Sequence, residues 1–217
     1  MNLKILLEPD AISETLADLI AINSVNPAFH GPGESEIAAY VADFFGRTGI
    51  PCVVQEIDDR RGNVIGRIEG SEAGCLIIFD AHADTASAVD MSIDPFRPVC
   101  RDGRMFGRGA CDTKAGLAAM MHAARIVTRQ KERPRATIWI VATADEEYSL
   151  KGIRRLVGSV IAEAAVVAEP TELRPIVASK GCLRWRINVH GRAAHSSKPH
   201  LGVNAIAKMC RLVLGVE

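Results

Sequence analysis

The chain has no excess of charge of either sign and no long hydrophobic run. Its 217 residues contain 26 Lys and Arg and 26 Asp and Glu, so the formal net charge is zero. A balanced charge gives no electrostatic reason to expect a nucleic-acid or membrane-surface partner. No apolar run reaches the roughly 18 residues that a membrane-spanning helix needs. The segment from Met1 to Glu8 meets an acidic residue too early for the apolar core of a signal peptide. We therefore expect a cytoplasmic protein.

Paired cysteines are also absent. The six cysteines, at positions 52, 75, 100, 111, 182 and 210, are scattered and include no C-x-x-C pair, which favours reduced thiols over a disulfide framework. The sequence contains no internal repeat and no low-complexity segment. Hydrophobic residues make up 48% of the chain and its mean hydropathy is +0.11, so a sizeable core can form.

Helices alternate with short apolar strands along most of the sequence. The apolar spacing predicts helices over residues 11–22, 34–48, 114–130 and 150–157, and strands over 51–56, 63–68, 75–81, 136–144 and 164–168. Ser13 is placed to cap the first helix, and turn signals occur at residues 94–96 and 101–104. The later strands are almost continuously apolar, as strands covered on both faces are. This order predicts an α/β fold with a largely parallel sheet.

The sequence pattern changes after about residue 175. Residues 183–189 alternate between polar and apolar side chains as a half-exposed strand does, residues 191–204 form a polar turn, and a helix begins near Val203. We predict a first domain over residues 1–175 and the start of a second domain over residues 176–217.

Polar residues that suit a metal site stand at the ends of these predicted strands. His82 and Asp84 follow the apolar segment 75–79, and residues i and i+2 of a strand point to the same face. A ligating histidine needs a partner on its other ring nitrogen, and Asp84 is placed to provide one. Asp112, the run 145–147 and Glu169 follow at further strand ends or turns. Because ligands collect at the carboxyl ends of parallel strands, these residues predict a hydrolytic metal site.

Each of these residues also has a plainer interpretation. A histidine near a strand end is commonly structural, and Asp112 would suit the N-cap of the helix that follows it. A phosphate-cradling loop at Gly107–Lys114 is disfavoured, because its glycine spacing matches neither G-x-G-x-x-G nor G-x-x-x-x-G-K-[ST]. Three acids in a row usually form a solvated patch, although a cation would offset their repulsion at the mouth of a buried strand. Taken alone, His195 would be a surface histidine.

The order of the motifs resembles the M20 family of dinuclear zinc amidohydrolases, which includes acetylornithine deacetylase, succinyl-diaminopimelate desuccinylase and aminoacylase. The resemblance covers nearly the whole chain and is carried by the segments AHADT (81–85), GRGACDTK (107–114), TADEE (143–147), AEP (168–170), HSSKP (195–199) and GVNAI (202–206). The family fold is a three-layer zinc aminopeptidase-like catalytic domain with an α+β lid or dimerisation domain. The resemblance therefore implies hydrolysis of the amide bond of an N-acyl amino acid. The segments around Thr143 and His195 are most similar to those of acetylornithine deacetylase.

The resemblance also implies a role for each matching residue. His82 and Glu169 would hold one metal ion, Glu147 would hold the other, and Asp112 would bridge the two. Glu146 would be the general base and Asp84 would orient His82. His195 would belong to the lid domain and stabilise the oxyanion, in many members across the interface of a homodimer. The metal would be Zn²⁺, with Co²⁺ or Mn²⁺ also compatible, and a cis peptide bond often follows the bridging Asp112.

The sequence departs from the family pattern in two ways. The late His ligand that the family uses has no counterpart in these 217 residues, so the second metal site would have only Asp112 and Glu147. Ala81 stands before His82, where glycine is usual. The alternative function is therefore a truncated, non-catalytic metal-binding or oligomerising fragment. The substrate would be a small N-acyl amino acid or a short peptide, and the sequence does not choose between acyl groups.

Overall fold

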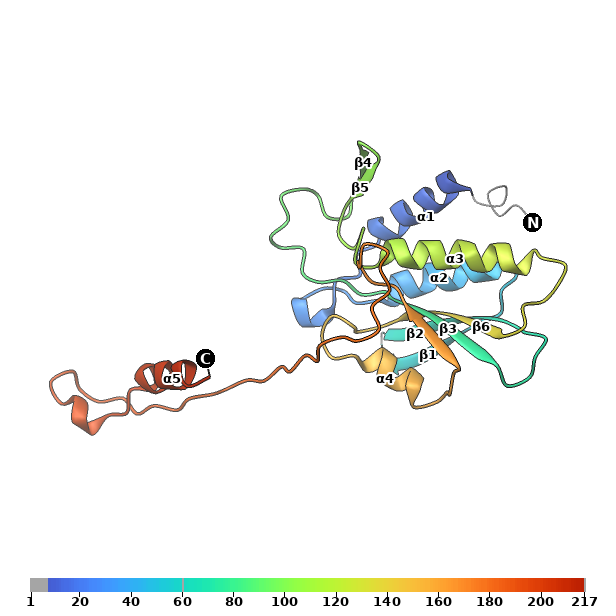
Figure 1. Cartoon of the computed structure of the whole chain (residues 1–217). Helices are drawn as coiled ribbons and strands as arrows, with labels where there is room; N and C mark the ends of the chain where they lie inside the picture. The colour runs from blue at the N-terminus through green and yellow to red at the C-terminus, as the bar shows by residue number, and fades with distance from the viewer. Residues whose placement is uncertain (1–7, 60, 217) are drawn as a thin grey trace. The chain divides into compact units, whose positions relative to one another are not determined.

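The computed structural model describes residues 8–59 and 61–216. The chain divides into two compact units, the first ending at Arg174 and the second beginning at Pro175. The first unit contains a central sheet with helices on both faces, and the second contains a short 3-10 helix and one α-helix (Figure 1). The six cysteines are free thiols. None of the helices in the described ranges is long and apolar enough to cross a membrane.

Five strands form the central sheet, in the spatial order β1-β2-β6-β3-β7. Strand β3 runs parallel to both β6 and β7, whereas β2 is antiparallel to β6 and to β1. The strands are β1 (Cys52–Asp58), β2 (Arg61–Ile68), β3 (Leu76–His82), β6 (Thr137–Thr143) and β7 (Ala164–Val167). The predicted α/β class is confirmed, with its parallel strands grouped where the predicted site residues lie and an antiparallel pair at one edge.

Helices cover both faces of the sheet and create a hydrophobic core on each. The helices are α1 (Pro9–Ala21), α2 (Ser35–Thr48), α3 (Lys114–Thr128) and α4 (Lys151–Val157). Helices α1, α2 and α3 lie on one side and α4 on the other, which gives three layers (Figure 1). On the larger side, Phe45, Leu117 and Met121 are fully buried against the sheet. On the α4 side, Leu156 packs near Ile78 and Val141.

The first helix begins earlier than the sequence predicted, so Ser13 does not cap it. Helix α1 starts at Pro9, and Ser13 Oγ instead donates a hydrogen bond to the Pro9 carbonyl at 3.0 Å inside the first turns. Proline suits the first helical position because its missing N–H has no intrahelical partner there and its φ is already helical. Asp10 adds a negative charge near the positive end of the helix dipole. These two residues explain the earlier start.

A buried lysine joins the end of α1 to the beginning of α3. Lys114 is fully buried, and its Nζ donates hydrogen bonds to the carbonyls of Leu19 at 2.7 Å and Ile22 at 2.8 Å. The last carbonyls of a helix have no intrahelical donor, so the ammonium group satisfies groups that would otherwise be unpaired. Burial lowers the pKa of Lys114 to about 7. This contact fixes the start of α3, two residues after Asp112.

A small hairpin lies between β3 and α3. It consists of β4 (Val99–Arg101) and β5 (Arg104–Phe106), which pair in an antiparallel register. The two residues between them, Asp102 and Gly103, both have positive φ, at 52° and 71°. Two consecutive positive φ values are the requirement of a type I′ hairpin turn. The turn predicted over residues 101–104 is therefore confirmed.

The second unit does not contain the strand predicted over residues 183–189. These residues are described but have no regular hydrogen-bonded pairing, and residues 183–188 are exposed. Alternation gives a strand one apolar face, but its backbone also needs a neighbouring strand. The pairing described in this unit is a single bridge between Arg192 and Val203. Helix α5 (Ala205–Leu214) follows the 3-10 helix Pro199–Leu201, and the side chain of Asn204 caps α5 by accepting from Ala207 N at 3.0 Å.

Candidate metal centre

The strand register brings the ends of β3, β6 and β7 to one edge of the sheet. In the parallel pair β3–β6, His82 lies opposite Thr143, so the acidic run 145–147 leaves the sheet beside His82. In the pair β3–β7, Asp80 lies opposite Val167, and Ala168 N donates to the Asp80 carbonyl at 2.8 Å. Glu169 therefore emerges at the same edge. Three segments that are far apart in sequence meet because their strands are parallel and in register.

His82 is held by hydrogen bonds at both ring nitrogens. Its Nδ1 lies 2.8 Å from the main-chain carbonyl of Asp84, and its Nε2 lies 2.9 Å from Asp112 Oδ1. A carbonyl only accepts, so Nδ1 carries a proton and Nε2 faces Asp112. Burial lowers the pKa of His82, but the Asp112 hydrogen bond and the charge of Asp84 outweigh it and raise the pKa to about 9. The pocket around Nε2 therefore favours a cation.

His82, Asp112 and Glu169 each direct a possible ligand atom to this point. One nitrogen and two carboxylate oxygens lie within 4.8 Å of one another, and no larger group of this kind occurs in the described ranges. Ligands of one zinc ion lie about 2.0–2.2 Å from it, so two of them are at most about 4.4 Å apart. The set is thus close to binding distance, and its imidazole and carboxylate donors suit zinc, cobalt or manganese. The residues fit a divalent metal ion.

The surroundings of Asp112 and Glu169 agree with a cation between them. The His82 hydrogen bond lowers the pKa of Asp112, whose side chain is 52% exposed. Burial first, and then the nearby carboxylates, raise the pKa of Glu169. Asp112 does not cap α3, because Thr113 occupies the N-cap position, and the Asp112–Thr113 peptide bond is cis, as the resemblance implied. Thr113 Oγ1 donates to the Ala168 carbonyl at 2.9 Å, which joins the start of α3 to the end of β7.

Asp84 contacts His82 through its main chain, whereas its carboxylate holds the acidic run. The closest carboxylate oxygen lies 3.7 Å from His82 Nδ1, beyond hydrogen-bonding distance. Asp84 Oδ1 accepts from Glu146 N at 3.0 Å, and Oδ2 accepts from Glu147 N at 3.1 Å. Asp84 is fully buried. Asp84 therefore orients the imidazole through its main-chain carbonyl. Its carboxylate orients the main chain of Glu146 and Glu147.

Glu147 and Glu146 lie beside the three-residue group rather than inside it. Glu147 Oε1 accepts a hydrogen bond from Ala86 N at 2.9 Å. Burial, together with the charges of Asp112 and Asp84, raises the pKa of Glu147 despite the opposing influence of His82. The charge of Glu146 acts on His82 and on Glu169. The roles of Glu147 as a second ligand and of Glu146 as a base stay predictions.

His195 belongs to the second unit. Its Nδ1 lies 2.8 Å from Ser197 Oγ and accepts from Ser197 N at 3.2 Å. These bonds hold the ring within the exposed turn that precedes the 3-10 helix. The predicted action of His195 on the reacting carbonyl stays a prediction.

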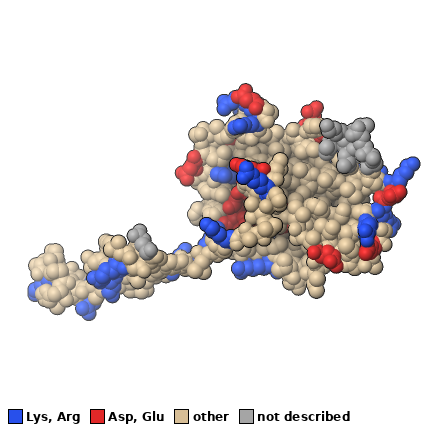
Figure 2. All heavy atoms as spheres, viewed as in Figure 1, with Lys and Arg blue, Asp and Glu red and all other residues tan. Residues whose placement is uncertain are grey.

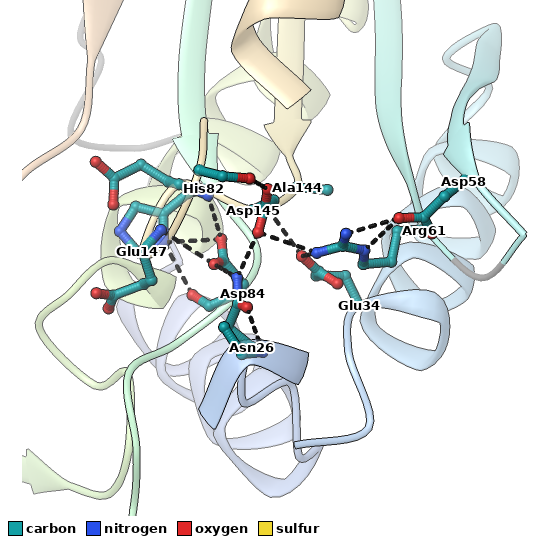
Figure 3. A network of polar contacts seen from close by, with 12 residues as sticks. Asn26, Glu34, Asp58, Arg61, His82, Asp84, Ala144, Asp145 and Glu147 are labelled. Atoms are coloured by element: carbon teal, nitrogen blue, oxygen red, sulfur yellow. Dashed lines mark hydrogen bonds and ion pairs between the residues drawn. The ribbon is translucent and has the colours of Figure 1, made fainter. Parts of the chain in front are cut away.

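Sequence reasoning missed a layer of buried polar residues beneath these groups. Figure 3 shows Asn26, Glu34 and Arg61 converging on Asp84 and Asp145. Burial, and then the charge of Asp84, raise the pKa of Glu34 to about 7. A local signal exists only for Asn26, because an Asn-Pro pair is typical of a turn. Arg61 and Glu34 follow no periodic pattern, so only the fold reveals their contacts.

The two units differ in the charge of the surface that Figure 2 shows. Over the first unit, Lys and Arg atoms are interspersed with Asp and Glu atoms, and one acidic group lies in a recess. The charged side chains of the second unit, over residues 175–216, are all Lys or Arg.

Several known proteins are similar to this chain. A probable succinyl-diaminopimelate desuccinylase of Staphylococcus epidermidis is 33% identical over 208 residues, which cover 93% of this chain and 49% of that protein. An acetylornithine deacetylase of Myxococcus xanthus is 31% identical over 214 residues, covering 95% of this chain and 54% of the relative. The chain thus spans about half the length of these curated relatives.

Solved structures share the fold. A tripeptidase from Staphylococcus aureus superposes with a TM-score of 0.68 at 21% identity, covering 96% of this chain and 56% of that one. The aminopeptidase PepT from Bacillus cereus gives a TM-score of 0.64 at 22% identity, covering 96% and 57%.

The family model described as Peptidase family M20/M25/M40 matches residues 78–217. That range includes every predicted ligand and catalytic residue, and it extends over more than half of the chain. The chain belongs to the peptidase family M20/M25/M40.

Proposed function

We propose that this site carries out metal-dependent hydrolysis of the amide bond of an N-acyl amino acid or a short peptide. The observation that carries the proposal is the meeting of His82, Asp112 and Glu169, whose ligand atoms lie within 4.8 Å of one another. The names of the relatives, a deacetylase and a probable desuccinylase, support an acyl amino acid as the substrate. Acetylornithine is the first substrate to test.

The metal ion would be held by Nε2 of His82 and by the carboxylates of Asp112 and Glu169. We propose zinc, and cobalt or manganese would suit the same donors. When bound, the ion would polarise the substrate carbonyl and lower the pKa of a bound water. Glu147 would contribute to a second ion that shares Asp112.

Glu146 is our candidate for the group that moves the proton. Its main-chain N–H is fixed by Asp84, so the residue starts from a defined position at the mouth of β6. The carboxylate would take a proton from the attacking water and pass it to the leaving amine. A proton acceptor is useful here only if it is not itself a ligand, and Glu146 lies outside the three-residue group.

We further propose that the active protein is a homodimer in which His195 stabilises the oxyanion. An imidazole N–H aimed at a developing negative charge contributes roughly 3–4 kcal/mol to the transition state. This part of the proposal rests on the motif HSSKP at residues 195–199.

The test combines metal binding with turnover. The purified chain is titrated with Zn²⁺ and with Co²⁺ by calorimetry, and hydrolysis of N-acetylornithine and N-succinyl-diaminopimelate is then followed by the release of free amine. We expect Glu146→Gln to bind metal like the unaltered chain and to lose turnover. Glu163→Gln is the matched control, because Glu163 is exposed at the opposite end of β7 from Glu169. Normal turnover by Glu146→Gln would remove Glu146 from its role.

A second candidate function is favoured by the small number of ligands. Among the described residues the metal group has three members, which is enough to hold one ion but leaves a second ion weakly bound. The chain would then be a non-catalytic metal-binding or oligomerising unit. Binding of a single ion with no hydrolysis of either substrate would favour this alternative, whereas two ions with turnover would favour the enzyme.

A further inference from the structure

The contacts beneath the metal group form a continuous path from solvent-shielded Arg61 to the main chain of Glu146 and Glu147. We infer that Asn26, Asp145 and Arg61 are positioning residues, which act through Asp84 to fix His82 and the acidic run (Figure 3). Asn26 and Asp145 are each 1% exposed, so they act on the site through other residues. The inference rests on the proposed function only for the roles given to Glu146 and Glu147.

Asn26 is the link between two carboxylates. Its Nδ2 group donates one hydrogen bond to Asp84 Oδ2 at 2.7 Å and another to Asp145 Oδ1 at 2.9 Å. Side-chain amides offer two N–H donors on one uncharged group, which is what two neighbouring carboxylates require. Aspartate at this position would lose both donors and add a third negative charge. Leucine has a similar size but would leave both carboxylates without this partner.

Asn26 is itself held in place from its other atoms. Its side-chain Oδ1 accepts from Ala28 N at 2.9 Å, at the start of the short 3-10 helix Pro27–Phe29. Its main-chain N–H donates to the Thr85 carbonyl at 2.9 Å, next to Asp84. The amide therefore cannot rotate without breaking local structure. Because this amide is fixed, the position of the loop after α1 determines where Asn26 can hydrogen-bond to Asp84.

Asp145 occupies the turn that carries the acidic run out of β6. Its φ is +64°, in the left-handed region that residues other than glycine seldom adopt. Its carboxylate accepts from Asn26, from Arg61 Nη1 at 3.0 Å and from Ser149 Oγ, and its main-chain N–H donates to Glu34 Oε1 at 2.8 Å. These bonds hold the turn in its unusual conformation and so determine where the next two residues point.

Arg61 supplies the positive charge of this layer. Its guanidinium pairs with Asp145 at 3.0 Å and with Asp58 at 2.6 Å, and it lies 3.9 Å from Glu34. Its side chain is 9% exposed, so the attraction is little screened by solvent. Because Arg61 starts β2 and Glu34 precedes α2, the layer ties the turn after β6 to two separate elements.

The inference is tested by amide hydrogen exchange, which needs neither metal nor substrate. In the unaltered chain the N–H groups of Glu146 and Glu147 are bonded to Asp84 and should exchange slowly. We expect Asn26→Leu to speed their exchange by about tenfold or more, because local opening follows the loss of local bonds. The control is Thr15→Val, which removes a buried hydrogen bond to His122 Nε2 (2.8 Å) between α1 and α3.

Metal affinity is a second measurement, made on these variants and on variants of Arg61. Loss of a group that orients a ligand typically costs about 10–100-fold in metal affinity. We expect Asn26→Leu and Arg61→Met to fall in that range for Zn²⁺ measured by calorimetry, with Thr15→Val within about twofold. Arg61→Lys should recover part of the loss, because it keeps a positive charge near Asp145.

Two results would overturn the inference. One is slow exchange of the Glu146 and Glu147 amides in a folded Asn26→Leu chain. The other is an equal acceleration in Thr15→Val, which would show a general loss of stability. If the unaltered chain binds no metal, the proposed function fails, but the exchange experiment still decides the positioning role. The two failures are therefore distinguishable.

Discussion

The metal centre has two layers that differ in burial and in the number of bonds each residue makes. In the lower layer, Asn26, Asp84 and Asp145 are 1% exposed or less, and the carboxylates of Asp84 and Asp145 each accept hydrogen bonds from three donors. In the upper layer, Asp112 and Glu169 are exposed, and their carboxylates face one another around a single imidazole. The lower layer is built to stay fixed, and the upper layer is built to receive a cation. Buried polar networks are costly when incomplete, so a mutation in the lower layer should destabilise the metal-free protein far more than one in the upper layer.

The largest effect should come from removing the centre of the lower layer. Asp84→Ala leaves the buried N–H groups of Glu146, Glu147 and Asn26 without their acceptor. We expect the free energy of unfolding to fall by about 3–5 kcal/mol, as is usual when a buried charged network loses a member. Urea unfolding followed by circular dichroism measures the change. Asp90→Ala, at an exposed position, should stay within about 0.5 kcal/mol of the unaltered chain. A loss no larger than that in Asp84→Ala would contradict the division into layers.

A smaller change in the free energy of unfolding should follow when Glu34, in the lower layer, loses its proton as the pH rises. Burial raises the pKa of Glu34 from 4.5 to about 7, so between these values the folded chain keeps a proton that the unfolded chain has lost. Its contribution to stability is therefore greatest below pH 4.5 and is lost as the pH rises to about 7. The contribution of Glu34 to the free energy of unfolding is at most on the order of 3 kcal/mol.

Glu34→Gln isolates this contribution, because glutamine does not titrate. We expect the difference in unfolding free energy between the variant and the unaltered chain to change with pH, with the variant gaining relative stability towards neutral pH. Glu36→Gln, at an exposed position of α2, should follow the unaltered chain at every pH. Parallel curves for Glu34→Gln and the unaltered chain would show that Glu34 keeps an ordinary pKa.

The smallest effect on the metal-free protein should come from the upper layer. Glu169→Gln removes one of the exposed carboxylates, so the unfolding free energy without metal should stay within about 0.5 kcal/mol. Excess zinc stabilises a protein that binds it, by about 2.7 kcal/mol at 100 times the dissociation constant. We expect this zinc-dependent rise in melting temperature to shrink strongly in Glu169→Gln and to persist in Glu163→Gln. An undiminished rise in Glu169→Gln would place the ion elsewhere.

The sequence indicated the upper layer because its residues stand at recognisable places. His82 ends an apolar strand, Glu169 follows one and Asp112 lies just before a helix, and strand ends of a parallel sheet converge. The same reasoning located most elements of the first unit within a few residues. The reasoning was wrong at Ser13, because Pro9 starts the helix earlier. It was also wrong over residues 183–189, whose alternation predicts a strand although their backbone has no neighbouring strand to pair with.

The lower layer could not be found in this way. Asn26, Glu34 and Arg61 come from three separate segments and follow no repeating pattern. The Asn-Pro pair indicates a turn at Asn26, but nothing local places any of the three beneath the metal group. The contact between Asp84 and His82 shows the same limit. The spacing of two residues predicted Asp84 as the partner of the imidazole, and only the structure shows that its main-chain carbonyl makes this contact while its carboxylate accepts from the acidic run.

The amino-acid order by itself determined which residues reach the carboxyl edge of the sheet, because periodicity fixes the strands and parallel strands share one edge. Only the tertiary structure decided how those residues are held. Buried charges are stable solely where donors from other segments meet them, and the positions of those donors depend on the packing of the whole first unit.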